Sequence, residues 1–137
     1  MYLLDTNILS ELRKVPAVRN QQVQTWVETQ DKTSLFISVI SLLEIRRGIH
    51  ILEKRGDAAQ AAIFFNWLQH QVQPAFADRT LNIDKTIALR TATLPWPTPA
   101  DYRDALIAST ALTFDATVVT RNVKDFEATQ GDCIYLS

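Results

Sequence analysis

The sequence predicts one α/β domain, in which a central parallel sheet is covered by helices on both faces. Short apolar runs typical of buried strands alternate along the chain with longer segments of helical periodicity. The chain has 137 residues, which is enough to bury one hydrophobic core. No internal repeat, low-complexity stretch or linker divides it, so we expect a single domain over residues 1–137.

Two strands and two helices are expected in the first forty residues. The strands are the apolar runs at residues 2–4 and 35–39. Residues 8–14 and 18–29 have helical patterns, and Pro16 separates them because proline interrupts a helix. The first strand therefore leads into a short polar turn and then into a helix.

Two longer helices are expected next. Ser41 and Glu44 have the spacing of a capping box, which predicts a helix over residues 41–54. Asp57 is expected to cap a second helix that ends near Val72, because apolar side chains recur there at every fourth position.

The rest of the chain is expected to supply three strands and two helices. The strands are the apolar or β-branched runs at residues 80–82, 116–120 and 134–136. The helices are expected at residues 84–93 and 99–113, the second following a stiff proline-rich loop. Because strands and helices alternate, the sheet is expected to be parallel.

The composition excludes several kinds of site. Cys133 is the only cysteine, so the chain has no internal disulfide or cysteine zinc cluster, and His50 and His70 are expected at the surface. Three scattered glycines do not form a phosphate-binding loop. No apolar run or leader indicates a membrane span or signal peptide, so we expect a cytoplasmic protein without a membrane partner. Any chemistry would rest on carboxylates.

Two aspartates occupy unusual positions. Asp5 directly follows the first strand, and ligands of open parallel sheets bind beyond the carboxyl ends of strands. The alternative is an aspartate that only stabilises its own turn. Asp104 falls on the apolar face of its helix beside Ile107 and Ala108, where a carboxylate is costly unless a cation or donors satisfy it. The alternative there is a buried ion pair with an arginine.

Two further polar positions belong to the same pattern. Glu44 lies at the edge of the apolar face of its helix, and the absence of a side chain at Gly48 leaves space one turn later. Its alternative role is the capping box. Asn122 and Asp125 follow the strand at residues 116–120, again at a carboxyl end, where the alternative is an ordinary polar loop.

These positions can converge on one cavity at the end of the sheet. Clustered carboxylates repel one another unless a divalent cation neutralises them. Oxygen ligands without histidine or cysteine favour Mg²⁺ or Mn²⁺ over zinc. Such ions are completed by phosphate oxygens, so the pattern favours phosphoryl chemistry.

Four motifs in this order and spacing resemble those of the PIN-domain nucleases, and most closely the toxin ribonucleases of bacterial VapBC or FitAB modules. They lie at residues 3–7, 41–48, 104–108 and 120–126, so the resemblance spans most of the chain. It implies a Mg²⁺- or Mn²⁺-dependent endoribonuclease that acts on RNA. It also implies a cognate VapB- or FitA-like antitoxin as inhibitor, and a homodimer that assembles further with that antitoxin.

The resemblance also assigns roles. Asp5, Glu44 and Asp104 match the three acidic metal ligands of the family, whereas the fourth acidic position falls on Asn122. Asp125 is the candidate to supply a carboxylate in its place. The implied mechanism has Asp5 and Asp104 holding the metal, with Glu44 as a ligand or positioning the attacking water. Hydrolysis would leave a 5′-phosphate and a 3′-hydroxyl.

Supporting roles follow from the same resemblance and from the charges near the motifs. Thr6 and Thr120 are expected to orient Asp5 and a metal-bound water. Phe65 and Trp96 are candidates for contact with an antitoxin or a second protomer. The cations expected to contact RNA phosphates, or else to be solvated surface charges, are Arg13, Lys14, Arg46, Arg47, Arg103, Arg121 and Lys124.

Two alternatives remain open. Phosphatases of the haloacid-dehalogenase type also place an aspartate after the first strand, but they need a second aspartate where this chain has Asn7. A catalytically weakened PIN domain that serves as an RNA- or protein-binding scaffold is favoured by Asn122. The presence of the other three acids argues against it.

Overall fold

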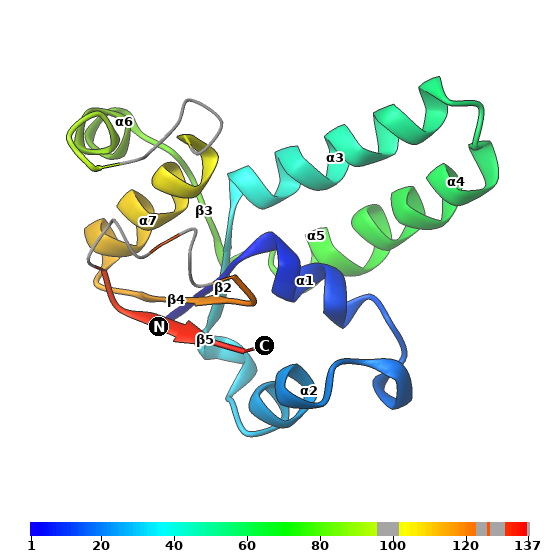
Figure 1. Ribbon diagram of the computed structural model, residues 1–137, viewed down its shortest axis with the longest axis horizontal. Coiled ribbons are helices and arrows are strands. Elements are labelled where there is room, and N and C mark those ends of the chain that lie inside the picture. The colour runs from blue at the N-terminus through cyan, green and yellow to red at the C-terminus, as the bar shows by residue number, and fades with distance from the viewer. Residues whose placement is uncertain (96–101, 123–125, 127–130, 137) are drawn as a thin grey trace.

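A five-stranded sheet forms the centre of the computed structural model, which describes residues 1–95, 102–122, 126 and 131–136 (Figure 1). Its order is β3-β2-β1-β4-β5, and every neighbouring pair is parallel, as predicted. The strands are β1 (Tyr2–Leu4), β2 (Leu35–Ser38), β3 (Thr80–Leu81), β4 (Thr117–Thr120) and β5 (Cys133–Tyr135).

Helices cover both faces of this sheet, which confirms the predicted architecture. Among the described residues they are α1 (Thr6–Leu12), α2 (Gln21–Glu28), α3 (Val39–Lys54), α4 (Ala58–Trp67), α5 (Gln73–Ala75), α6 (Lys85–Thr91) and α7 (Tyr102–Phe114). Figure 1 shows α6 and α7 on one side and α1 and α2 on the other, while α3 and α4 form an antiparallel hairpin that extends away from the sheet.

The core has one part on each face of the sheet. Successive strand residues point to opposite faces, so Leu3 packs with α7 residues such as Ile107, whereas Leu4 packs with residues of α1 and α3. Both leucines are fully buried. The central strands β1 and β4 pair in the register Leu3 with Val118 and Leu4 with Val119, so their carboxyl ends lie side by side.

The predicted start of α3 is wrong. The helix begins at Val39, because Ser38 at the end of β2 is its N-cap and accepts a hydrogen bond from the Ile40 N–H at 3.0 Å. Ser41 is buried inside the first turn, where it cannot serve as the N-cap. The capping-box role predicted for Ser41 and Glu44 is therefore excluded, and both side chains are available for contacts with other elements.

Other element boundaries also differ from the predicted ones. Helix α1 begins directly at Thr6, two residues earlier than predicted, because Asp5 caps it. The segment predicted as one helix up to Val72 consists of α4 followed by a π-helical turn at Leu68–Val72. The predicted start of α7, at residue 99, lies outside the described residues.

The surface agrees with several predictions from sequence. His50 and His70 are exposed, and Phe65 is 41% exposed on α4. Trp96, the other aromatic candidate for a contact surface, lies outside the described residues. None of the described helices is both long and apolar enough to span a bilayer.

Candidate active site

Three of the predicted site residues line one cavity beyond the carboxyl ends of β1 and β4. Asp5 comes from the end of β1, Glu44 from α3 and Asp104 from the first turn of α7. The cavity has a volume of about 370 Å³. Its lining residues are Asp5, Thr6, Asn7, Ser10, Glu44, Arg103 and Asp104.

Asp5 is held by both its own helix and the neighbouring strand. Its side chain is only 5% exposed, and its backbone N–H donates to the Val119 carbonyl at 2.9 Å. Oδ1 accepts from the Thr6 N–H at 2.8 Å, which caps α1, and Oδ2 accepts from the Thr120 hydroxyl at 2.8 Å. The turn-stabilising role and the position in the cavity, which sequence reasoning treated as alternatives, therefore coexist in one carboxylate.

Glu44 faces the start of α1. Its Oε1 accepts from the Thr6 hydroxyl at 2.9 Å, and the Thr6 hydroxyl also lies 2.8 Å from the Ser41 hydroxyl. Thr6 thus contacts Asp5 through its backbone N–H and Glu44 through its side chain. This contact explains why Ser41 and Glu44 both point toward α1.

Arg103 brings a positive charge to the cavity. Its Nη1 lies 3.7 Å from Glu44 Oε2, and both side chains are partly exposed. The sequence predicts Arg103 as an RNA contact or a solvated surface charge, and it does not predict this pairing with Glu44. Its neighbour Asp104 is half-buried and lines the same cavity. The guanidinium therefore offsets part of the repulsion among the carboxylates.

Thr120 connects the end of β4 to the start of α1. Its hydroxyl donates to Asp5, as the predicted orienting role requires, and accepts from the Asn122 N–H at 3.0 Å and the Asn7 Nδ2 at 3.3 Å. The Asn7 Oδ1 in turn accepts from the Arg121 N–H at 3.1 Å. Residues 120–122 are therefore bonded to the first turn of α1.

Of the two remaining predicted site residues, the structure describes only Asn122. Asn122 is exposed and is not among the described residues that line the acidic cavity. Its backbone N–H supports Thr120 instead. Asp125 lies outside the described residues, so its predicted role stays a prediction.

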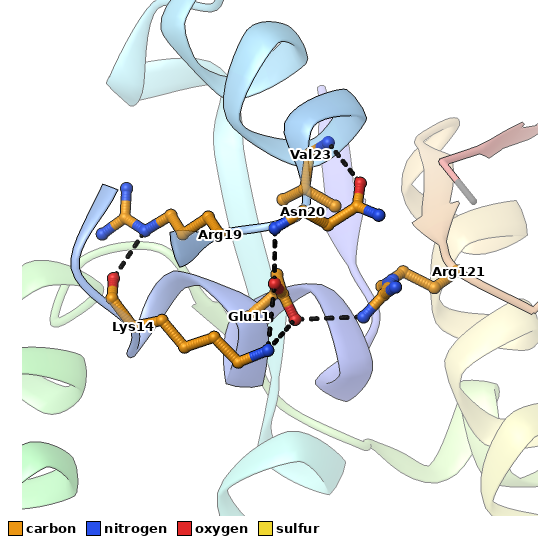
Figure 2. A network of polar contacts seen from close by, with 6 residues as sticks. All are labelled: Glu11, Lys14, Arg19, Asn20, Val23 and Arg121. Carbon is orange, nitrogen blue, oxygen red and sulfur yellow. Dashed lines mark hydrogen bonds and ion pairs between the residues drawn. The ribbon is translucent and has the colours of Figure 1, made fainter. Parts of the chain in front are cut away.

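A buried carboxylate that sequence reasoning missed lies near the other end of α1 (Figure 2). Glu11 is 4% exposed and accepts hydrogen bonds from the Asn20 N–H at 2.6 Å and from Lys14 and Arg121, each at 3.0 Å. The Asn20 N–H, followed by Lys14 and Arg121, lowers the pKa of Glu11 even though burial opposes this. The available signal was its position one turn after the buried Ile8.

The donor chemistry of the acidic cavity fits a hard divalent cation. Three carboxylates line it, together with the hydroxyls of Thr6 and Ser10, the Asn7 amide and the Arg103 guanidinium, and the described lining residues include no histidine or cysteine. In the part of the chain that the structure describes, no three acidic, histidine or cysteine side chains already converge closely enough to hold an ion. The site is therefore suitable in its ligand types, without being a preformed cage.

Comparisons with known proteins agree on one family. The model of the PIN domain matches residues 2–131. The chain is 35% identical to the plasmid stability protein StbB of Pseudomonas syringae pv. tomato, covering 93% of this chain and 92% of that protein. It is 32% identical to the VapC ribonuclease Y4jK of Sinorhizobium fredii, covering 98% of this chain and 96% of that protein. The crystal structure of FitAcB from Neisseria gonorrhoeae superposes on this chain with a TM-score of 0.82 at 26% identity, covering 98% of this chain and 96% of that one.

Proposed function

The chain belongs to the PIN-domain family, and from this premise we propose that it is a Mg²⁺- or Mn²⁺-dependent endoribonuclease, the toxin of a toxin–antitoxin module. One observation carries the proposal: Asp5, Glu44 and Asp104, from three distant segments, line a single cavity at the carboxyl edge of the sheet. The similarity to a protein named VapC ribonuclease supports RNA as the substrate.

Asp5 and Asp104 would hold the cation, and Glu44 would be a third ligand or the group that positions water. When bound, the cation supplies a Lewis acid that neutralises phosphate charge and makes water a better nucleophile. Thr120 and Thr6 keep the Asp5 carboxylate in a fixed orientation through the bonds to its two oxygens. Asp5 is therefore a ligand that is oriented before the substrate arrives.

Glu44 and Arg103 would act on the substrate and the water. Water attacks the phosphorus atom, the bond from phosphorus to the 3′-oxygen breaks, and the products are a 5′-phosphate and a 3′-hydroxyl. The Glu44 carboxylate can accept the proton that the attacking water loses, while the leaving 3′-oxygen takes a proton from solvent. Arg103 is partly exposed beside Glu44, so its guanidinium can contact a phosphate oxygen.

An antitoxin would be the natural inhibitor of such a site. A largely apolar groove of about 330 Å³ adjoins the acidic cavity and shares Thr6 and Glu44 with it. Ile49, Leu52 and Phe64 contribute apolar surface to the groove. Because the two spaces share residues, a peptide segment seated in the groove would block access to the carboxylates. The 30% identity of this chain to a protein named toxin FitB supports an antitoxin as the partner.

The proposal is tested by Mn²⁺ binding to the antitoxin-free protein. Calorimetry should detect binding in the wild type and no binding in Asp104→Asn, because the variant loses a charged ligand. Asp115→Asn is the matched control. It removes the same charge just beyond the other end of α7, at an exposed position whose φ of 53° asparagine tolerates. Incubation of total RNA with Mn²⁺ should give cleavage with the wild type and Asp115→Asn only.

Two outcomes would overturn the assignment. Retained Mn²⁺ binding or cleavage by Asp104→Asn would show that the acidic cavity is not the active site. Binding of RNA without cleavage, in the presence of Mn²⁺, would favour a weakened PIN domain that acts as a scaffold. The specific observation behind this second candidate is Asn122, which stands exposed at the family's fourth acidic position.

A further inference from the structure

We infer that the ion pair between Glu11 and Arg121 is a positioning device for the acidic site, which holds the end of β4 on helix α1 so that Thr120 can orient Asp5. Neither residue is among the described residues that line the acidic cavity. The catalytic consequence of this inference rests on the proposed nuclease function. The positioning itself does not, because it concerns contacts within the folded chain.

The ion pair joins segments that are far apart in the sequence. Glu11 Oε2 lies 3.0 Å from Arg121 Nη1, and the Glu11 side chain is 5% exposed compared with 35% for Arg121 (Figure 2). Glu11 belongs to the last turn of α1, whereas Arg121 directly follows β4. The contact therefore fixes the segment after β4 against the side of α1.

A second set of bonds ties the same two segments together closer to the cavity. The Arg121 N–H donates to Asn7 Oδ1, Asn7 Nδ2 donates to the Thr120 hydroxyl, and that hydroxyl donates to Asp5 Oδ2. Arg121 therefore bonds to α1 twice, through its backbone near the start of the helix and through its side chain near the end. Two attachments on one helix limit both the shift and the rotation of residues 120–122 relative to Asp5.

Lys14 provides an internal control for this role. Its Nζ lies 3.0 Å from the same Glu11 oxygen, but the contact spans only three residues. Replacing Lys14 therefore removes one cation from Glu11 without detaching β4 from α1. Replacing Arg121 also removes one cation from Glu11, and in addition it removes the side-chain attachment of the segment after β4 to α1, leaving only the backbone attachment through Asn7. In both variants the Asn20 N–H continues to satisfy Glu11, so the carboxylate is not left unpaired.

The contact also bears on the role of Arg121 toward RNA. A guanidinium engaged by a buried carboxylate is committed to the protein, and its electrostatic attraction for phosphate is reduced by the nearby negative charge. A positioning role and an RNA-binding role therefore predict different effects of Glu11→Gln. The positioning role predicts that Glu11→Gln lowers RNA cleavage as much as Arg121→Gln does. The RNA-binding role predicts that Glu11→Gln leaves cleavage unchanged or binds RNA more tightly.

The first measurement needs neither metal nor RNA. Amide hydrogen exchange at Arg121 and Asn122, measured by NMR on the full chain, reports the bonds that these N–H groups make to Asn7 and Thr120. Exchange should become about tenfold faster in Glu11→Gln and in Arg121→Gln, and it should stay at the wild-type rate in Lys14→Gln.

The second measurement is the dissociation constant for Mn²⁺ alone, followed by RNA cleavage. Disturbing the groups that orient metal ligands costs about 10- to 100-fold in affinity or activity, and we expect about tenfold weaker Mn²⁺ binding in Glu11→Gln and Arg121→Gln. The double variant should be no worse than either single variant, because both break the same contact. In cleavage assays kcat should fall while KM stays unchanged.

Several results would overturn the inference. Exchange rates in Glu11→Gln that match those in Lys14→Gln would show that the ion pair does not hold β4. An increase in KM for Arg121→Gln alone would make Arg121 an RNA contact. If the wild type binds no Mn²⁺, the proposed function fails, while the exchange rates still decide the positioning role. If Glu11→Gln does not fold, the partly exposed Arg121 and its charge-conserving variant Arg121→Lys carry the same comparison.

Discussion

The two ends of helix α1 bury carboxylates in different ways. Asp5 at its start accepts from a backbone N–H and a hydroxyl and lines the acidic cavity. Glu11 in its last turn accepts from two cations and a backbone N–H, and it lies away from that cavity. The ion pairs of Glu11 match its charge within the chain, as expected of a structural carboxylate. Asp5, whose two carboxylate oxygens accept from the Thr6 N–H and the Thr120 hydroxyl at the cavity wall, is the proposed ligand of a cation from solution.

The largest expected effect is on activity, at the start of the helix. Asp5→Asn should lower RNA cleavage by more than about 100-fold, because loss of a ligand costs more than disturbing the groups around it. Stability should change little, because asparagine is as good an N-cap as aspartate. Cleavage assays and thermal unfolding check both parts. Asp57→Asn, which changes the exposed N-cap of α4 in the same way, should leave cleavage unchanged.

At Glu11, in the last turn of α1, the expected effect is on stability. Glu11→Ala should reduce the free energy of unfolding by about 2 kcal/mol, since it removes a buried group that satisfies three donors. The value is at the lower end for buried pairs because Lys14 and Arg121 reach solvent. Urea unfolding measures it. Glu53→Ala, which breaks the exposed pair with Arg46, should cost less than about 0.5 kcal/mol.

An equal loss of stability in Glu11→Ala and Glu53→Ala would remove the distinction between the two ends of α1. Glu11 would then contribute no more to the free energy of unfolding than an exposed glutamate does. A 100-fold loss of cleavage in Asp57→Asn would be equally damaging, because it would trace the Asp5 effect to helix capping rather than to the cavity.

Thr120 links the two ends, and its replacement sharpens the comparison. Thr120→Val keeps the shape of the side chain but removes the hydroxyl that donates to Asp5. We expect about tenfold weaker Mn²⁺ binding by calorimetry. Thr110→Val is the matched control, since it removes an equally buried hydroxyl that bonds only within α7 in the contacts described. Unchanged Mn²⁺ affinity in Thr120→Val would contradict the orienting role.

The carboxylates of the acidic cavity were easier to predict from the sequence than the ion pair between Glu11 and Arg121. Asp5 was identifiable because it follows a buried strand, and Asp104 because it interrupts an apolar face, and both are local signals. Glu11 was not identifiable, because its decisive partner Arg121 is distant in the sequence and only the fold brings them together. The prediction of where α3 begins was wrong for a similar reason. A capping box at Ser41 fits the local pattern, and the competing cap at Ser38 and the contact with Thr6 decide against it.

The partners of the cations near the motifs were likewise not predictable from the sequence. Arg13 lies over the Phe64 ring at 4.5 Å, and Arg46 pairs with Glu53. Both had been assigned to RNA contacts or to solvent, because sequence position alone does not reveal an intramolecular partner. Contact with RNA by these cations stays a prediction. Lys124, assigned in the same way, lies outside the described residues.

The smallest expected effect concerns the pH dependence of stability and isolates the contribution of Glu11. The Asn20 N–H, Lys14 and Arg121 lower the pKa of Glu11 in the folded chain below the ordinary value for a glutamate, so its contribution to stability is fully present above that ordinary value. The contribution is lost as the pH falls through the lowered pKa, because the unfolded chain then binds the proton first. Urea unfolding from pH 6 to pH 3 should therefore show a steeper loss of stability for the wild type than for Glu11→Gln. The two curves should converge in acid, because protonated Glu11 no longer carries the charge that distinguishes it from glutamine. Parallel curves would mean that the charge of Glu11, and with it the ion pair to Arg121, contributes nothing to holding β4 on α1.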